Sequence, residues 1–161
     1  MAATLDLCYQ LKDYILSEPV QTALNAVYSG PWTATVRYSI NDEASDLDTL
    51  EISVLPGQIN QGKPIRMAME VEYEMGVQLR KRLDSTDEIP NLASFAEELF
   101  LLLDSWSPTS PARTRGVSRL PLETASVYAY ESESSALTYD SIISVPVKYW
   151  YRKAMAAGGD S

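Results

Sequence analysis

The fold is decided by residues 65–80, which read IRMAMEVEYEMGVQLR. Apolar and polar side chains alternate through this whole stretch, and an extended strand places every second side chain on the same face. A helix would scatter the same apolar side chains around its axis. We therefore predict one long strand with a buried face and a solvent-exposed face, in which Gly76 marks a bulge or a bend.

Helical segments are predicted before and after this strand. Residues 4–28 carry apolar side chains at helical spacing. Pro19 interrupts this segment, and Ser17 is placed to cap the second, shorter helix. A further helix is expected over residues 90–105, because it has a broad apolar stripe, Pro90 in its first turn and acidic residues just before it.

The remaining periodic segments are predicted to be shorter strands, at residues 32–38, 50–54, 122–130 and 139–151. Pro146 cannot donate a hydrogen bond to a neighbouring strand, so the last of these is expected at a sheet edge or with a bulge. The segments between them are predicted to be connections without regular structure, at residues 41–48, 55–64 and 107–121.

The whole chain is consistent with one globular domain. It has 161 residues, of which 45% are hydrophobic and 22% charged. We predict a single α+β domain over residues 1–152, with a mixed, mostly antiparallel sheet and the helices packed on it. Residues 153–161 are predicted to be a disordered tail. No membrane span is expected, because the longest uncharged apolar run, Leu99 to Leu103, is far shorter than the roughly 20 residues required.

The composition argues against most enzyme classes. The chain has no histidine, which excludes a histidine-based triad and the usual zinc-activated water. Its single cysteine, Cys8, lies on an apolar helical row and is expected in the core or an interface. No glycine-rich phosphate-binding motif is present. We therefore expect a protein without catalytic residues, metal or cofactor, although catalysis by carboxylates alone stays open.

The charge is strongly negative. The net charge is −9 and the computed pI is near 4.4, while residues 105–161 carry a small positive excess. Such a surface repels phosphate, so tight binding of nucleic acid is not expected. A weakly repelling surface is nevertheless suited to letting DNA slide past.

Three local patterns carry a resemblance to a known family. They are the strand Leu50 to Pro56 (LEISVLP), the long strand leading to Arg80-Lys81-Arg82 and then to a helix with Ala-Glu-Glu-Leu at 96–99, and the closing segment Ser141 to Tyr149 (SIISVPVKY). Together they resemble the tail terminator and tail-completion (neck) proteins of long-tailed bacteriophages. The likeness spans roughly residues 1–152 and rests on the order of elements rather than on an invariant motif.

The resemblance implies a non-enzymatic virion protein. It would be made in the bacterial cytoplasm and would form a homo-oligomeric, hexameric ring at the head-proximal end of the tail. That ring would end tube polymerisation and join the tail to the head. Its partners would be the tail-tube protein and a head–tail connector protein, with DNA only in transient passage through the lumen and no membrane. A closed heterologous ring requires two different patches on each subunit.

Three groups of residues are candidates for such roles. One group is a row of carboxylates on one strand face, Glu70, Glu72 and Glu74. This row is expected to line the channel; the alternative is an ordinary solvated strand face.

A second group is the basic loop that contains Arg113, Arg115 and Arg119. This loop is expected to contact a neighbouring subunit or ring; the alternative is a flexible solvent loop.

The third group consists of consecutive aromatic residues, Tyr149, Trp150 and Tyr151. Three successive residues of a strand cannot all point inward, so at least one faces outward and is a candidate interface residue. The alternative is that the aromatic residues pack under the N-terminal helix.

Two other functions remain open from the sequence. One is a head-side connector, an adaptor or stopper between portal and tail. The other is a cytosolic adaptor or ligand-binding module, which a deep apolar pocket and monomeric behaviour would favour.

Overall fold

The computed structural model describes residues 2–38, 48–65, 68–131 and 137–152, and it confirms an α+β fold with a mixed, mostly antiparallel sheet. The helices are α1 (Ala3–Ile15), α2 (Glu18–Val27) and α3 (Ile89–Asp104), with a 3₁₀ turn, η2 (Thr86–Glu88), before α3. The strands are β1 (Trp32–Val36), β2 (Leu50–Leu55), β3 (Ile59–Ile65), β4 (Ala68–Arg82), β5 (Thr114–Arg119), β6 (Glu123–Glu131) and β7 (Leu137–Arg152).

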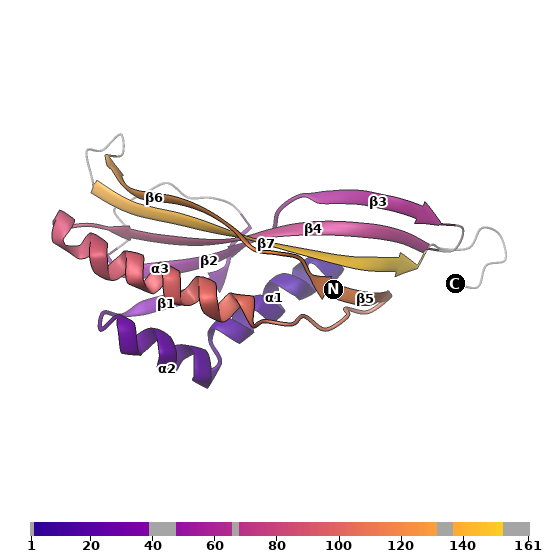
Figure 1. The fold of residues 1–161 in the computed structure, drawn as a ribbon, viewed down its shortest axis with the longest axis horizontal. Coiled ribbons are helices and arrows are strands. Elements are labelled where there is room, and N and C mark those ends of the chain that lie inside the picture. The colour runs from indigo at the N-terminus through magenta and orange to yellow at the C-terminus, as the bar shows by residue number, and fades with distance from the viewer. Residues whose placement is uncertain (1, 39–47, 66–67, 132–136, 153–161) are drawn as a thin grey trace.

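The sheet is built around β4 and β7, which pair antiparallel without interruption from Ala68↔Arg152 to Arg82↔Thr138. β2 and β3 follow one another along the outer edge of β4, and β5 and β6 do the same along the outer edge of β7. β1 adds to β2 as a parallel neighbour. Figure 1 shows β3 and the adjoining ends of β4 and β7 extending beyond the helices.

The outer edge of β4 is interrupted between β2 and β3. β2 ends at Leu55, opposite Gly76, and β3 begins at Ile59, opposite Tyr73. In the gap, Gly57 lies against the carbonyl oxygen of Glu74, where a β-carbon would come within 1.8 Å of that oxygen. Because only glycine lacks a β-carbon, this close approach requires glycine.

The outer edge of β7 is interrupted at the same level. β5 ends opposite Val147, and β6 begins opposite Ser144. In this gap the Leu120 N–H donates to the carbonyl oxygen of Pro146 at 2.8 Å. The N–H and C=O of one strand residue point to the same side, so the N–H that Pro146 lacks would have pointed into the gap rather than toward β4.

This arrangement corrects the expectation that Pro146 places the last strand at an edge or introduces a bulge. β7 is an inner strand with neighbours on both sides, and its pairing with β4 continues in register through Pro146. The proline is tolerated because no hydrogen bond of the β4–β7 ladder is lost.

The core lies between one face of the sheet and the helices (Figure 1). The two predicted helical segments are confirmed, and each contributes fully buried side chains. The core residues of the helices include Leu7, Cys8, Leu11, Ile15, Leu24, Leu92, Phe95, Leu99 and Leu103, and those of the central strands include Tyr73, Met75, Val77, Ile143, Val145 and Val147. Burial of Cys8 confirms its expected place in the core.

Two predicted connections contain strands. Residues 55–64 include most of β3, which pairs antiparallel with β4, so the long strand begins at Ala68 and Ile65 lies on the preceding strand. Residues 107–121 include β5, which was predicted to be loop. Residues 41–47 of the predicted acidic connection and the predicted tail at 153–161 lie outside the described residues.

Two local predictions are also corrected. Gly76 keeps a regular register with Ser144 and so marks no bulge in the β4–β7 pairing. One register shift lies instead at Gly116 of β5, which has a φ of 66°. Ser17 occupies the first position before α2, but its hydroxyl donates backward to the Tyr14 carbonyl instead of capping α2. None of the helices in the described ranges is long and apolar enough to cross a membrane.

Candidate functional site

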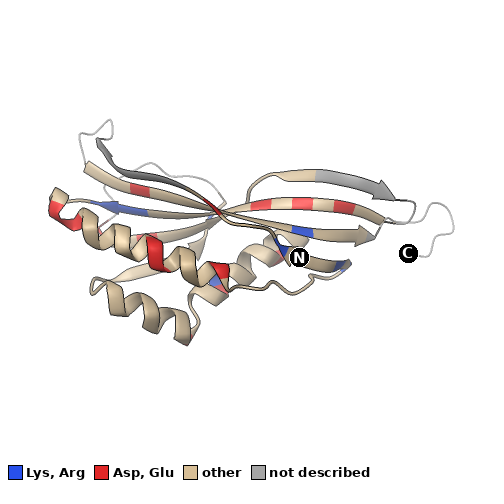
Figure 2. Ribbon diagram, in the orientation of Figure 1, with Lys and Arg blue, Asp and Glu red and all other residues tan. Residues whose placement is uncertain are grey.

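The carboxylate row lies on the sheet face opposite the core. Glu72 and Glu74 are exposed and Glu70 is half-buried, whereas the intervening Val71 and Tyr73 are buried against the helices. Figure 2 shows the three glutamates as a row on β4. Within the described part of the chain none of them forms an ion pair, so their charge is directed to solvent.

The neighbouring strand β7 places one positively charged side chain beside this row. Lys148 of β7 is the register partner of Glu72, while Trp150 lies opposite Glu70 and Pro146 opposite Glu74. Directly opposed residues have β-carbons about 5 Å apart, so Lys148 partly offsets the repulsion among the glutamates. The sequence does not indicate this neighbour, because the pairing of β4 with β7 depends on the tertiary fold.

The part of the same face that lies next to β2 is also polar, but its charged side chains pair with one another. The carboxylate of Glu51 on β2 forms ion pairs with Arg37 and with Arg80, the latter at 3.7 Å, and it accepts a hydrogen bond from Ser53 at 3.1 Å. Arg80 is only 3% exposed. This polar network was not predicted, because Arg80, its member on β4, occupies the same alternating positions as the exposed glutamates.

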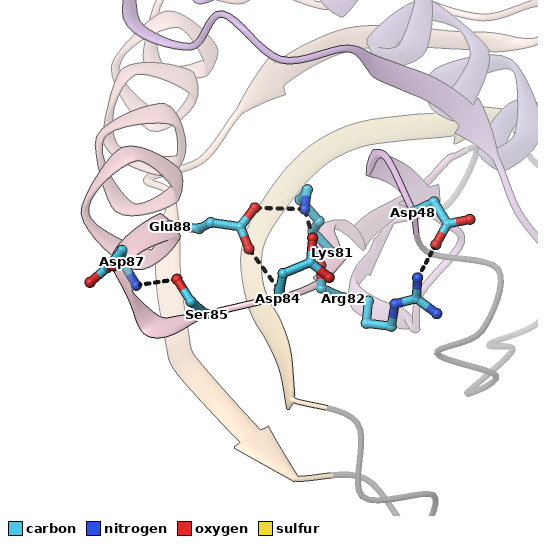
Figure 3. Close-up of polar contacts among 7 residues, drawn as sticks. All are labelled: Asp48, Lys81, Arg82, Asp84, Ser85, Asp87 and Glu88. Atoms are coloured by element: carbon cyan, nitrogen blue, oxygen red, sulfur yellow. Dashed lines mark hydrogen bonds and ion pairs between the residues drawn. The ribbon is translucent and has the colours of Figure 1, made fainter.

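Next to this network, the rest of the basic triplet Arg80-Lys81-Arg82 is also engaged within the molecule, and Figure 3 shows the contacts of Lys81 and Arg82. Lys81 donates to Glu88 at 2.9 Å and to the Arg82 carbonyl at 3.0 Å, and Arg82 pairs with Asp48. Glu88 also accepts from the Asp84 N–H at 2.8 Å. Lys81 therefore fastens the connection from β4 to α3, while Arg80 and Arg82 pair with Glu51 of β2 and with Asp48 just before it, so the triplet does not form an open basic surface.

The pKa of Glu88 reflects these contacts. Partial burial acts to raise it, but the hydrogen bonds from Lys81 and from the Asp84 N–H outweigh burial and hold the pKa below its ordinary value. Glu88 is thus a charged anchor at the start of α3, where the helix dipole also favours negative charge.

The structure separates the three predicted interface arginines. Arg119 donates to the main-chain carbonyls of Asp104 at 2.7 Å, Trp106 at 3.2 Å and Leu120 at 3.0 Å, and it pairs with the Asp104 carboxylate at 3.2 Å. These bonds satisfy carbonyls at the end of α3, so Arg119 has a structural role. Arg113 and Arg115 are exposed.

The aromatic residues divide between the two faces of β7, which confirms that they do not all point inward. Tyr149 is buried in the core, where burial raises its pKa. Trp150 is half-buried on the open face beside Gly116, where an added β-carbon would lie 3.3 Å from its ring. Tyr151 is half-buried, with the Arg113 guanidinium 5.9 Å from its ring centre.

The end of the sheet that contains β5 differs from the rest of the described structure in its ion pairing. Among the lysines and arginines whose side chains the structure describes, only Arg113, Arg115 and Lys148 lack an ion-pair partner. The ion pairs of the others are Lys12–Asp13, Arg37–Glu51, Arg80–Glu51, Lys81–Glu88, Arg82–Asp48 and Arg119–Asp104. We call Arg113, Arg115, Trp150 and Tyr151 the basic corner; Arg115 and Trp150 are register partners.

The single thiol is placed for packing rather than chemistry. The Cys8 sulfur lies 3.4 Å from the Tyr73 hydroxyl oxygen in the core, and burial raises the pKa of both groups. A buried thiol with a raised pKa is a poor nucleophile. The described residues also contain no group of three or more histidine, cysteine, aspartate or glutamate side chains able to hold a metal ion.

Two shallow hollows flank the end of α2. One of about 250 Å³ is lined by Leu16, Gln21, Asn25, Gly30, Pro31 and Trp32, and the other of about 220 Å³ by residues 25–29 and Asn91. Both are smaller than typical small-molecule sites, and both are partly polar.

Comparison with known proteins finds no protein-family model that matches the sequence and no similar protein among curated sequences.

Proposed function

We propose that this protein is a structural subunit of a ring at the head-proximal end of a bacteriophage tail, where the ring ends tube polymerisation and joins the tail to the head. The order of the sequence patterns over residues 1–152 motivates the proposal. The observation that carries it is the row Glu70, Glu72 and Glu74 on an open sheet face, without an ion pair among the described residues.

A carboxylate row of this kind suits the inner wall of a DNA channel. Copies arranged around an axis with this face inward would surround the passing DNA with carboxylates. DNA is released from such a wall because its phosphates are repelled. The opposed Lys148 keeps the repulsion weak, so the channel would not prevent DNA from entering.

The elongated shape also supports ring assembly. The end of the sheet formed by β3, β4 and β7 extends beyond the helices (Figure 1), so contacts at that end leave the core undisturbed. A closed ring requires two different contact patches on each copy, and an elongated molecule with a helical part and a projecting sheet end provides separate surfaces for them.

A tube-polymerisation assay tests this function directly. Purified protein is added to polymerising tail-tube protein of the same phage, and tube lengths are measured by electron microscopy. We expect shorter tubes with additional density at one end, in proportion to the protein added. If tube length is unchanged but the protein binds the head connector, the head-side connector role replaces the terminator role. If it binds neither, the neck assignment is wrong.

A further inference from the structure

The basic corner is an unusual feature on an acidic protein. The chain carries a net charge of −9, yet Arg113 and Arg115 are exposed without an acidic partner among the described residues. Two large aromatic side chains, Trp150 and Tyr151, lie half-buried beside them. Arginine next to tyrosine and tryptophan is the composition that is enriched at the centre of protein interfaces.

A complementary surface lies on α3 of the same chain. Leu101 is 57% exposed, whereas Leu92, Phe95, Leu99 and Leu103 of the same helix are buried. Glu97 and Glu98 lie one turn before Leu101, and residues spaced by three and four share one side of a helix. Neither glutamate has an ion-pair partner among the described residues. This outward patch of α3, Glu97, Glu98 and Leu101, therefore offers an apolar side chain bordered by negative charge.

We propose that the basic corner of one copy binds the outward patch of α3 on the next copy. Arg113 and Arg115 would pair with Glu97 and Glu98, and Leu101 would pack against the exposed part of Trp150, which lies on the same face as its register partner Arg115. This contact would be the interface between subunits of the ring, and the inference rests on the proposed function.

The placement of the two patches favours contact between copies. Figures 1 and 2 show α3 toward one end of the long axis and β5 toward the other. The Arg119–Asp104 pair joins β5 to the end of α3, so the two patches belong to elements that are in direct contact. Two different complementary patches on one rigid chain produce head-to-tail association, the kind that closes into rings.

Charge reversal tests the contact. Association of the wild type is measured by analytical ultracentrifugation, or on tail tubes if association occurs only there, at low and high salt. We expect the double variant R113E/R115E and the double variant E97R/E98R each to weaken association at least about tenfold. Combining all four substitutions should restore it, because the charges are then exchanged. Leu101→Ser should weaken association without any change of charge.

The matched controls are Lys12→Glu and Glu123→Arg, which reverse charges elsewhere on the surface and should leave association unchanged. Thermal melts check that each variant folds, and a duplex DNA probe is titrated in parallel. Wild-type assembly that is insensitive to all the variants would overturn the contact while leaving the ring intact. DNA binding that is lost only in R113E/R115E, with assembly unchanged, would also overturn the contact and assign the corner to phosphate. A wild type that never self-associates, in solution or on tubes, would refute both the contact and the ring.

Discussion

Glu74 and Pro146 lie directly opposite each other on β4 and β7, and both outer edges of the sheet are interrupted at their level. Between these gaps only the two long strands continue. The pair therefore marks the boundary between a part of the sheet that is flanked by β2 and β6 and a part that is flanked by β3 and β5. The polar network lies in the first part, and the carboxylate row and the basic corner lie in the second.

The gap beside Glu74 predicts a strong dependence on glycine. In Gly57→Ala the added methyl group would meet the Glu74 carbonyl oxygen, so the backbone must shift, and we expect a loss of about 2 kcal/mol or more in the free energy of unfolding. The measurement is urea denaturation. Gly76→Ala is the matched control: a β-carbon there meets no atom closer than 3.8 Å, so stability should change little. Equal stability of the two variants would contradict the account of the gap.

Arg119 and Arg115 are predicted to differ although they lie on the same strand. Arg119→Ala leaves carbonyls at the end of α3 without their donor and should lower the free energy of unfolding by about 2 kcal/mol. Arg115→Ala removes an exposed side chain and should have almost no effect on the stability of the monomer. The two variants are compared by thermal or chemical unfolding at a concentration where the protein is monomeric. A larger loss of stability for Arg115→Ala than for Arg119→Ala would contradict the structural role of Arg119.

Glu88 predicts a defined pH dependence. Its pKa is lower in the folded protein than in the unfolded chain, so its ionised form stabilises the fold above the ordinary glutamate value of about 4.3, and that stabilisation is lost as the pH falls toward the folded pKa. The melting temperature of wild type should exceed that of Glu88→Gln at pH 6, and the difference should shrink below about pH 4.3. A difference that stays constant down to pH 3 would show that the charge of Glu88 does not contribute.

The carboxylate row predicts a defect in DNA passage without a defect in folding. Changing Glu70, Glu72 and Glu74 together to Lys alters only the open face of β4, so thermal stability and ring formation should remain close to wild type. A positive lumen would retain the DNA, and we expect fewer successful DNA ejections and reduced infectivity in the phage that carries these changes. The matched variant with Gln at all three positions should be less impaired. Normal infectivity of the Lys variant would rule out the channel role of the row.

The sequence predicts the elements that have strong periodicity and misses those that do not. The alternation up to Arg80 and the helical spacing of Cys8 and Phe95 follow directly from burial of one face, and these elements are confirmed. β3 was missed because Asn-Gln-Gly-Lys-Pro is a poor strand sequence, which an edge position tolerates. β5 was missed because the Gly116 bulge disrupts its alternation.

The site residues illustrate the same limit. The exposure of the glutamate row could be predicted because it alternates with buried neighbours. The position of Lys148 opposite Glu72, the structural role of Arg119 and the exposure of Leu101 depend on which elements meet in space. Pro146 was misinterpreted because the rule that excludes proline from inner strands does not apply at a gap in the neighbouring edge.

The proposal that this chain is a ring-forming neck subunit is best tested by measuring the mass of the purified protein by light scattering, alone and mixed with tail tubes of the same phage. A neck subunit would be either a closed oligomer in solution or a monomer that becomes bound to the tube end as a ring. A monomer at every concentration that is indifferent to the tubes would contradict the proposal.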